Sequence, residues 1–197
     1  QAELVAVRRS LGMGLDAVPL VVMAGMVMPW KGQHVLLAAA SEVLKKIPEA
    51  RFVIVGEAPS GAERYAKELE GMRFGYSVED AVTFVGYRDD IPAVMQAADV
   101  VVHASTSPEP FGRVVIEGMV MEAVVIATAI GAPPEIIEDG VSGFLVPPSD
   151  PHALAEKIVA TLRDDALLKK VGRRAREVVI ERYAISRHVG LIEAVFE

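Results

Sequence analysis

Cysteine is absent from this chain of 197 residues. Disulfide bonds, thiolate metal sites and a cysteine nucleophile are therefore excluded. Histidine is scarce, with four residues in the chain. These four, His34, His103, His152 and His188, lie far apart, without the short spacings that bring two imidazoles onto one metal ion. We therefore expect no metal site in this protein.

A long hydrophobic run is also missing. No apolar stretch reaches roughly 20 residues, the length that a membrane-spanning helix needs. The first residues carry their charges after the apolar positions, which is the wrong order for a secretory signal. The net charge of −7 argues against nonspecific binding to nucleic acid or to an anionic membrane. We expect a cytoplasmic protein without a nucleic-acid partner, which meets a membrane at most peripherally.

Short β-branched runs that alternate with helical patterns fill the chain from end to end. Continuous apolar strands are buried on both faces, and helices between parallel strands make right-handed crossovers. The pattern predicts one α/β domain with a doubly wound parallel sheet, Rossmann-like in type. The predicted strands are 20–24, 51–55, 82–85, 99–103, 124–127 and 143–146. The predicted helices are 33–47, 61–75, 89–98, 112–121, 133–138, 150–163, 165–182 and 185–196.

Ligands of such sheets bind beyond the carboxyl ends of the strands. Four glycine-containing loops are expected at that edge, namely 25–32, 56–61, 86–90 and 104–112. The first of them is not a dinucleotide fingerprint, because the second and third glycines of that motif are replaced by Val27 and Trp30. An oxidoreductase that uses a nicotinamide cofactor is therefore disfavoured.

Two carboxylates, Glu109 and Glu117, flank Phe111 and Gly112 in the last of these loops and the helix after it. A loop carboxylate can accept hydrogen bonds from sugar hydroxyls, and a glycine-opened helix N-terminus can direct N–H groups at phosphate. A carboxylate further along the helix can then hold the hydroxyls of a ribose. Lys31, just before another predicted helix, suits a diphosphate. The alternative is that Glu109 caps the helix, while Glu117 and Lys31 are solvated surface residues.

Segments along most of the chain share an order and spacing with one enzyme family. They are 25–32, 53–59 (VIVGEAP), 82–87 (VTFVGY), 97–102 (AADVVV), 109–117 (EPFGRVVIE), 131–137 (GAPPEII), 139–148 (DGVSGFLVPP) and 181–183 (ERY). Together they resemble the C-terminal, donor-binding domain of the retaining GT-B glycosyltransferases of family 4, the glycosyl transferases group 1. The resemblance covers about residues 19 to 183.

The resemblance implies transfer of a sugar from a UDP-, GDP- or ADP-linked donor with retention of configuration. It implies that Glu109 binds the transferred sugar and, with Lys31, serves catalysis, while Glu117 holds the ribose. The backbone of Arg88 would read the base, with Gly86 and Tyr87 shaping that pocket. Neither a cofactor nor a metal ion is implied. The remaining implied donor-binding residues are Gly25, Met26, Phe111, Gly112, Arg113 and Val114.

The sequence departs from the family pattern in two places, at Met26 and in the segment 118–124. Met26 stands where the family often has an arginine that would neutralise the diphosphate, and Arg113 is a candidate to replace that charge. The alternative for Arg113 is an ion pair with a surface carboxylate. Gly118 replaces the usual alanine after Glu117, and Glu122 and Val124 replace residues of the usual Gly-x-Pro turn. We interpret this as a local backbone variation with little bearing on the site.

The chain also matches only one half of such an enzyme. Residues 1–18 are expected to lead in from a missing N-terminal acceptor domain, 19–183 to form the donor-binding domain, and 184–197 to form a helix that crosses back. Without that partner the isolated chain is expected to be inactive. The competing interpretation is a nucleotide-sugar-binding module without turnover.

Two further residues have two interpretations each. His103 ends a predicted strand at the ligand edge, where it either hydrogen-bonds a ligand or is a satisfied residue of the core edge. Glu135 either faces the diphosphate or is an ordinary first-turn carboxylate of a helix.

Overall fold

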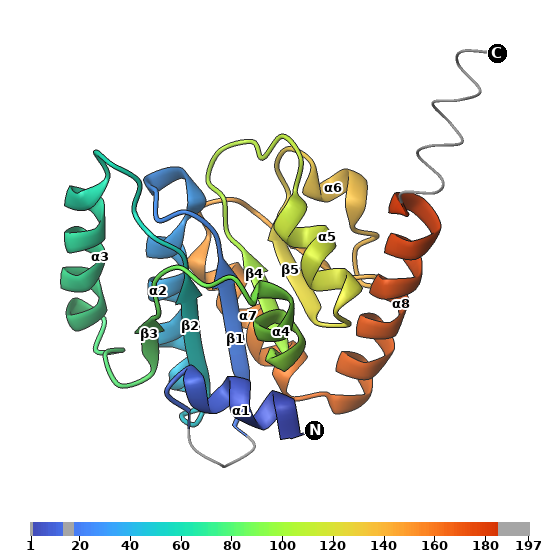
Figure 1. The fold of residues 1–197 in the computed structure, drawn as a ribbon, viewed down its shortest axis with the longest axis horizontal. Helices are drawn as coiled ribbons and strands as arrows, with labels where there is room; N and C mark the ends of the chain where they lie inside the picture. Colours follow the sequence, from blue (N-terminus) through green and yellow to red (C-terminus); the bar gives the residue numbers. More distant parts are fainter. Residues whose placement is uncertain (1, 14–17, 185–197) are drawn as a thin grey trace.

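The computed structural model describes residues 2–13 and 18–184. Within these residues a single sheet of six parallel strands has the order β3-β2-β1-β4-β5-β6 (Figure 1). The strands are β1 (Leu20–Ala24), β2 (Arg51–Val55), β3 (Val82–Phe84), β4 (Val100–His103), β5 (Val124–Thr128) and β6 (Phe144–Val146). This is the strand order of a doubly wound Rossmann-like sheet, as the sequence predicted.

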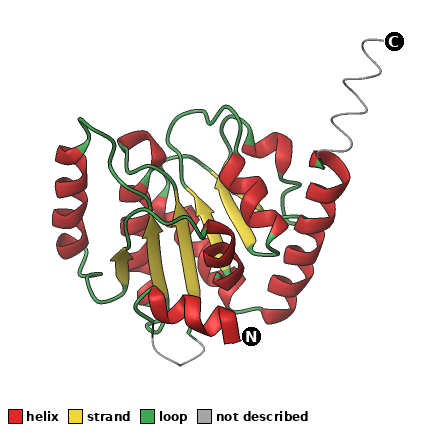
Figure 2. Ribbon diagram, viewed as in Figure 1, coloured by secondary structure: helices red, strands yellow, loops and turns green. Residues whose placement is uncertain are grey.

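Helices cover both faces of this sheet, so that the strands form a middle layer (Figure 2). The helices are α1 (Ala2–Ser10), α2 (Gln33–Leu44), α3 (Glu63–Gly75), α4 (Ile91–Ala97), α5 (Arg113–Val120), α6 (Pro133–Ile136), α7 (Pro151–Leu162) and α8 (Asp165–Tyr183), with a 3-10 turn at Pro29–Lys31. In Figure 1, α4 and α5 lie in front of the sheet, and α2 and α7 lie behind it.

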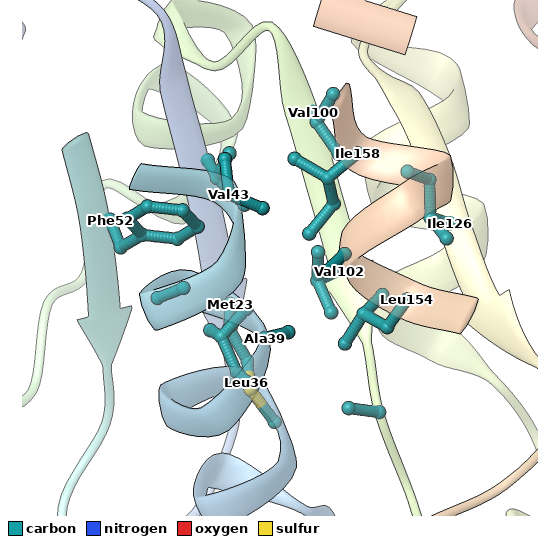
Figure 3. Packing of buried hydrophobic residues seen from close by; sticks show 14 of the residues in the cluster. Met23, Leu36, Ala39, Val43, Phe52, Val100, Val102, Ile126, Leu154 and Ile158 are labelled. Carbon is teal, nitrogen blue, oxygen red and sulfur yellow. The ribbon is translucent and has the colours of Figure 1, made fainter. Parts of the chain in front are cut away.

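The alternation of side chains along each strand divides the core into two layers. Phe52 and Ile54 of β2 pack on the side of α2 and α7, while Val53 and Val55 pack on the side of α4, α5 and α8. Figure 3 shows the first layer, in which Phe52 lies against α2 and Ile158 of α7 lies over β4. Both faces of the central strands are thus apolar, which explains why their sequences are continuous apolar runs and not alternating ones.

Predicted and observed elements agree apart from their ends. All six strands are present, and the helices differ by no more than a few residues, as where α2 ends at Leu44 instead of 47. The predicted helix 185–196 lies outside the described residues. Among residues 2–13 and 18–184, no helix is long and apolar enough to cross a lipid bilayer.

Helix α1, the predicted lead-in, packs against α4 of the sheet domain. Arg8 donates hydrogen bonds to the carbonyl oxygens of Val18 and Ala97 and forms an ion pair with Asp99 at 3.1 Å. Leu11, which follows α1, is buried in the core layer on that side. The described part of the lead-in is therefore fixed to the domain that follows it.

Glu122 ends the turn between α5 and β5 with a φ of 62°, in the left-handed region. A side chain in this conformation costs roughly 1–2 kcal/mol of stability. Glycine removes that cost, but part of the gain is offset because glycine has more conformational entropy in the unfolded chain. We expect Glu122→Gly to stabilise the fold by about 0.5–1 kcal/mol in urea denaturation.

Glu122→Ala is the matched control, because it removes the same carboxylate but keeps a Cβ. The ion pair of Glu122 with Arg176 spans 3.7 Å on the surface and should contribute little. An alanine variant that gains as much stability as the glycine variant would contradict an origin in backbone strain.

His152 joins α7 to α2 through an ion pair with Glu42 at 2.8 Å, and it also contacts Glu156 at 3.5 Å. The hydrogen bond to Glu42, followed by the charges of both carboxylates, raises the pKa of His152 above its ordinary 6.5. A raised folded-state pKa stabilises the protein below pH 6.5, and this contribution is lost as the pH rises through the raised value.

We therefore expect His152→Gln to destabilise the protein more at pH 6 than at pH 8.5. Thermal unfolding of both proteins across this range measures the difference. In a Glu42→Gln background most of the pH dependence of that difference should disappear, and its persistence would assign the effect to other groups.

Candidate functional site

The strand order brings the loops after β1 and β4 together at the carboxyl edge of the sheet. These two strands are neighbours in space, while their outer neighbours β2 and β5 continue in opposite directions. A doubly wound sheet opens a crevice at such a switch point, and ligands bind there. The loop 25–32 follows β1 and the loop 104–112 follows β4. The predicted ligand edge is therefore the place where these loops meet.

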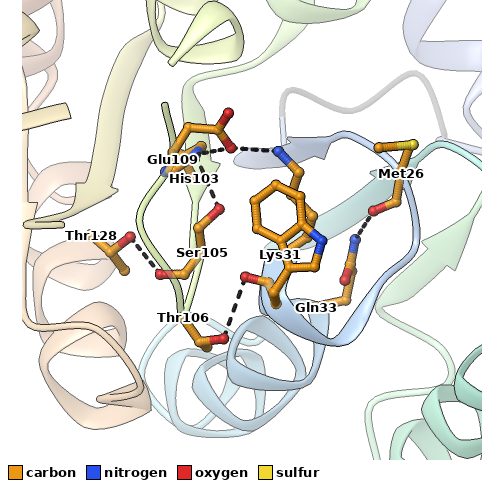
Figure 4. A network of polar contacts seen from close by, with 9 residues as sticks. Met26, Lys31, Gln33, His103, Ser105, Thr106, Glu109 and Thr128 are labelled. Atoms are coloured by element: carbon orange, nitrogen blue, oxygen red, sulfur yellow. Dashed lines mark hydrogen bonds and ion pairs between the residues drawn. The ribbon is translucent and has the colours of Figure 1, made fainter. Parts of the chain in front are cut away.

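Lys31 and Glu109 form an ion pair across this switch point, although they are 78 positions apart in sequence. The ammonium nitrogen of Lys31 lies 2.5 Å from Oε2 of Glu109, and their side chains are 15% and 12% exposed. The same ammonium lies 4.1 Å from the ring centroid of Trp30, in a cation–π contact. Figure 4 shows both side chains directed toward one another from the two loops.

The charge of Glu109 is maintained against its burial. Burial raises the pKa of the Glu109 carboxyl, but the hydrogen bond and charge of Lys31, aided by His103, outweigh it, so that the pKa lies below its ordinary value. The carboxyl is therefore ionised at neutral pH. It can accept hydrogen bonds from hydroxyl groups but cannot donate one.

Close backbone contacts hold the loop that carries Glu109. Gly131 forms a bridge with the backbone of Glu109, and the N–H of Ala132 donates to the Glu109 carbonyl at 2.8 Å. On the other side the N–H of Thr106 donates to the carbonyl of Trp30, also at 2.8 Å. A Cβ on Gly131 would lie 2.4 Å from the Glu109 nitrogen, so the approach requires glycine.

Gly112, whose φ of 63° is left-handed, is the N-cap residue of helix α5, and no side chain caps this helix end. The N–H groups of its first turn are therefore left for solvent or a ligand. Arg113 lies on this exposed turn and contacts Glu117 one turn later, with 3.4 Å between Nη2 and Oε1. Arg113 therefore shows the alternative arrangement, the pair with a carboxylate on the surface of the helix.

Two adjoining clefts lie along this edge. The larger, of about 400 Å³, is lined by the loops after β1, β2 and β3, and the smaller, of about 230 Å³, lies between Lys31 and the start of α5. Val114 and Glu117 line both clefts. The larger cleft also contains Gly25, Met26, Gly56, Glu57, Tyr87, Arg88 and Ile91, and the smaller contains Lys31, His103, Glu109, Phe111, Gly112 and Arg113.

The structure thus brings together the ten residues that were expected to serve catalysis or donor binding, although their roles stay predictions. The side chain of Met26 is half exposed, and its carbonyl accepts a hydrogen bond from buried Gln33 at 2.8 Å. The guanidinium of Arg88 is held by Asp90 at 2.6 Å and by Ser10 of α1 at 3.1 Å. Glu135 is exposed and lines neither of these clefts.

Sequence reasoning assigned no role to Glu57, Ala58, Pro59 or Ile91 of the larger cleft. The first three belong to the loop 56–61 after β2, which the sequence placed at the ligand edge without giving a role to any single residue of it. Ile91 begins α4 and carries no polar signal. Ser105 was also missed, because its position behind His103 depends on the way the loop after β4 folds back.

The fold and these clefts define an α/β domain of the GT-B glycosyltransferase type. Residues 15–178 match the family described as "Glycosyl transferases group 1". The chain therefore belongs to this family.

Known relatives agree with this assignment. A D-inositol 3-phosphate glycosyltransferase of Corynebacterium urealyticum is 35% identical over 163 residues, which are 80% of this chain and 38% of that protein. The crystal structure of Anabaena Alr3699/HepE in complex with UDP has a TM-score of 0.93 and 32% identity, covering 99% of this chain and 52% of that one. Sucrose-phosphate synthase of Thermosynechococcus elongatus has a TM-score of 0.83 and 34% identity, covering 96% and 48%. This chain thus spans about half or less of their length.

Proposed function

We propose that this chain is the donor-binding half of a retaining glycosyltransferase and that it binds a nucleoside diphosphate sugar. The observation that carries the proposal is the pair of adjoining clefts that share Glu117, with the Lys31–Glu109 pair in the smaller one. The larger cleft has room for a nucleoside, and the smaller has a cation and uncapped N–H groups for a diphosphate. Glu117, between them, is placed to accept hydrogen bonds from ribose hydroxyls.

In the proposed reaction the bond between the sugar and the diphosphate breaks, and negative charge develops on the departing phosphate. Lys31 and the N-terminus of α5 are fixed donors at that position and would stabilise the charge. Glu109 would orient the sugar through its hydroxyls. Because these donors belong to the protein, we propose that neither a metal ion nor a cofactor is needed.

Lys31 has donors for both of its proposed partners. An ammonium group offers three N–H donors, of which Glu109 takes one, so a phosphate oxygen can be bound without breaking the pair. Arg113 can add a second cation if its guanidinium leaves Glu117 for the diphosphate, and this would compensate for Met26. The contact between Arg113 and Glu117 is exposed and long, so it offers little resistance to that movement.

Calorimetric titration of the chain with UDP, GDP, ADP and their glucose conjugates, without metal, tests donor binding. Because complexes with UDP and with UDP-glucose are known for Anabaena HepE, we expect the uridine nucleotides to bind. Trp30 is the single tryptophan of the chain and lies against Lys31, so its fluorescence gives an independent readout.

Glu117→Ala should weaken the binding of UDP by about 10- to 100-fold, the loss of affinity expected for charge-assisted hydrogen bonds. Glu135→Ala, an exposed carboxylate outside both clefts, is the matched control and should bind like the wild type. The assignment would be overturned if wild type and Glu117→Ala had equal affinities for every nucleotide that binds. It would also be overturned if none of these nucleotides bound to a full-length protein that contains this chain.

Retention and turnover require the acceptor half, which we propose is joined to residues 1–18 and contacted by 184–197. With the N-terminal half present, proton NMR of the first product gives the anomeric configuration. Donor binding without any transfer would support the second candidate, a nucleotide-sugar-binding module, for which Met26 in place of an arginine is the specific observation.

A further inference from the structure

His103 is a buried imidazole behind the proposed sugar site, with 5% of its side chain exposed. It is the last residue of β4, so the rigid sheet fixes its backbone. Its Nε2 atom lies 3.5 Å from Oε2 of Glu109 and 3.2 Å from Oγ of Ser105. Sequence reasoning left open whether this histidine belongs to the core edge or to the site, and these contacts direct it toward Glu109.

The geometry selects one tautomer of His103. A carboxylate only accepts hydrogen bonds, so the contact with Glu109 requires a hydrogen on Nε2. Nδ1 is buried and has no hydrogen-bond partner among the described residues. The opposite tautomer would bury an unpaired N–H at Nδ1 and turn the lone pair of Nε2 toward a negative carboxylate. Burial, acting against Glu109, lowers the pKa of His103 and keeps the ring neutral at neutral pH.

Ser105 and Thr128 fix the ring and the loop behind it. With a hydrogen on Nε2, the hydroxyl oxygen of Ser105 accepts a share of it, and Ser105 is fully buried. The carbonyl of Ser105 in turn accepts a hydrogen bond from the hydroxyl of Thr128 in β5 at 2.8 Å. Figure 4 shows this chain of contacts running from Thr128 through Ser105 and His103 to Glu109.

Lys31 and His103, the two residues that donate to the Glu109 carboxylate, contact the same oxygen, Oε2. In the described part of the chain no hydrogen bond to Oε1 is present, and Figure 4 shows this second oxygen directed away from Lys31 and His103. One oxygen is therefore anchored and the other is available as an acceptor. If Lys31 shifts toward a diphosphate, His103 becomes the donor that still holds the anchored oxygen. The 3.5 Å contact is longer than an ideal hydrogen bond, and hydrogen bonds of catalytic sites often tighten when a substrate binds.

We propose that His103, supported by Ser105, is a positioning residue that holds Oε2 of Glu109 so that Oε1 is presented to a hydroxyl of the donor sugar. This inference rests on the proposed function, because it concerns how the same site distinguishes a nucleotide sugar from the bare nucleotide. The role should show in the affinity added by the sugar and not in the affinity for the nucleotide.

His103→Gln and His103→Asn form a matched pair of variants. The amide N–H of glutamine can reach the position of Nε2, whereas that of asparagine reaches only the region of Nδ1. Both place a polar amide in the same buried space, so a general loss of packing affects them alike. His152→Asn, at an exposed histidine far from the clefts, controls for the loss of an imidazole as such.

The affinities of UDP and UDP-glucose are measured for each protein. We expect His103→Asn to bind UDP within about twofold of wild type but UDP-glucose about tenfold more weakly, the loss for one charge-assisted hydrogen bond. His103→Gln should stay within about threefold for both ligands. The proposal would be overturned if both variants lost affinity for UDP and for UDP-glucose in parallel, or if His103→Asn kept its affinity for UDP-glucose.

Nitrogen NMR of the imidazoles decides the question even if neither ligand binds. The proposal requires a neutral His103 with its hydrogen on Nε2 at pH 7.5, and a change of that nitrogen resonance in Glu109→Gln. A hydrogen on Nδ1 would overturn it, and so would an Nε2 resonance of His103 that is the same in wild type and in Glu109→Gln. If a full-length protein that contains this chain binds no nucleotide while the spectra are as expected, the proposed function is refuted but the orientation of Glu109 by His103 is supported.

Discussion

Replacing Gly32 with alanine should destabilise the protein by about 3 kcal/mol and abolish donor binding. Gly32 has a φ of 81°, and a Cβ there would lie 1.9 Å from the carbonyl oxygen of Ala104. A side chain in the left-handed region costs roughly 1 kcal/mol, and overpacking against an atom that cannot rotate away adds about 2 kcal/mol more. The obstacle is backbone, so one of the two loops has to move.

The displaced loops are those that carry the site. Gly32 follows Lys31 directly, and Ala104 begins the segment that leads to Glu109. A shift that relieves the clash therefore separates the ammonium of Lys31 from the carboxylate of Glu109. Urea denaturation measures the loss of stability, and titration with UDP at a temperature where the variant is still folded measures the loss of the site.

Gly140→Ala is the matched control for Gly32→Ala. Gly140 has a similar φ of 75°, but a Cβ there would have no atom within 4 Å. Gly140→Ala should lose only the stability that a side chain in the left-handed region costs, about 1 kcal/mol, and it should bind UDP like the wild type. Equal destabilisation by the two substitutions would show that the approach of the two loops is looser than the structure has it.

The elements of the fold could be predicted because each strand is recognisable by itself. Runs such as 100–102 are apolar on both faces, and this marks a buried parallel strand wherever it lies in the sheet. The ends of helices were less certain, as with α2, because the last turn depends on tertiary contacts that sequence periodicity does not contain. The candidate ligand edge of the sheet followed from the parallel arrangement alone.

The contacts inside the site could not be predicted from local patterns. Lys31 and Glu109 meet because β1 and β4 are neighbours, and that pairing is a property of the strand order. The role of His103 was left open for the same reason, since its partner is on a loop that turns back over the strand end. Arg113 had two interpretations, a substitute for the missing cation at Met26 or an ion pair with a surface carboxylate, and its contact with Glu117 one helical turn later is the second of them.

Replacing Lys31 with methionine should cost about 2–4 kcal/mol at neutral pH, a loss comparable to that of breaking a buried ion pair. Methionine keeps much of the length of the side chain, so the main change is the loss of charge. Glu109 would be left mostly buried, with only the long contact to His103. Removal of the cation that opposes burial should raise the pKa of the Glu109 carboxyl, reversing the lowering present in the wild type.

The pH dependence of this loss identifies its origin. In the wild type the lowered pKa means that ionised Glu109 stabilises the fold above pH 4.5, the ordinary value, and that this contribution is lost as the pH falls through the lowered one. In Lys31→Met a raised pKa reverses the sign, so burial of the charge penalises the fold at neutral pH and protonation relieves the penalty. The difference in unfolding free energy should therefore be largest at pH 7 and shrink toward pH 4.5.

Combining Lys31→Met with Glu109→Gln separates stability from function. The double variant has no buried charge at this position, so it should regain more than half of the lost stability at pH 7. It should not regain UDP binding, which we expect to be about 10- to 100-fold weaker in both variants because the proposed phosphate ligand is gone. A double variant as unstable as Lys31→Met would show that the pair is not coupled, whereas recovery of UDP affinity would remove Lys31 from the proposed diphosphate site.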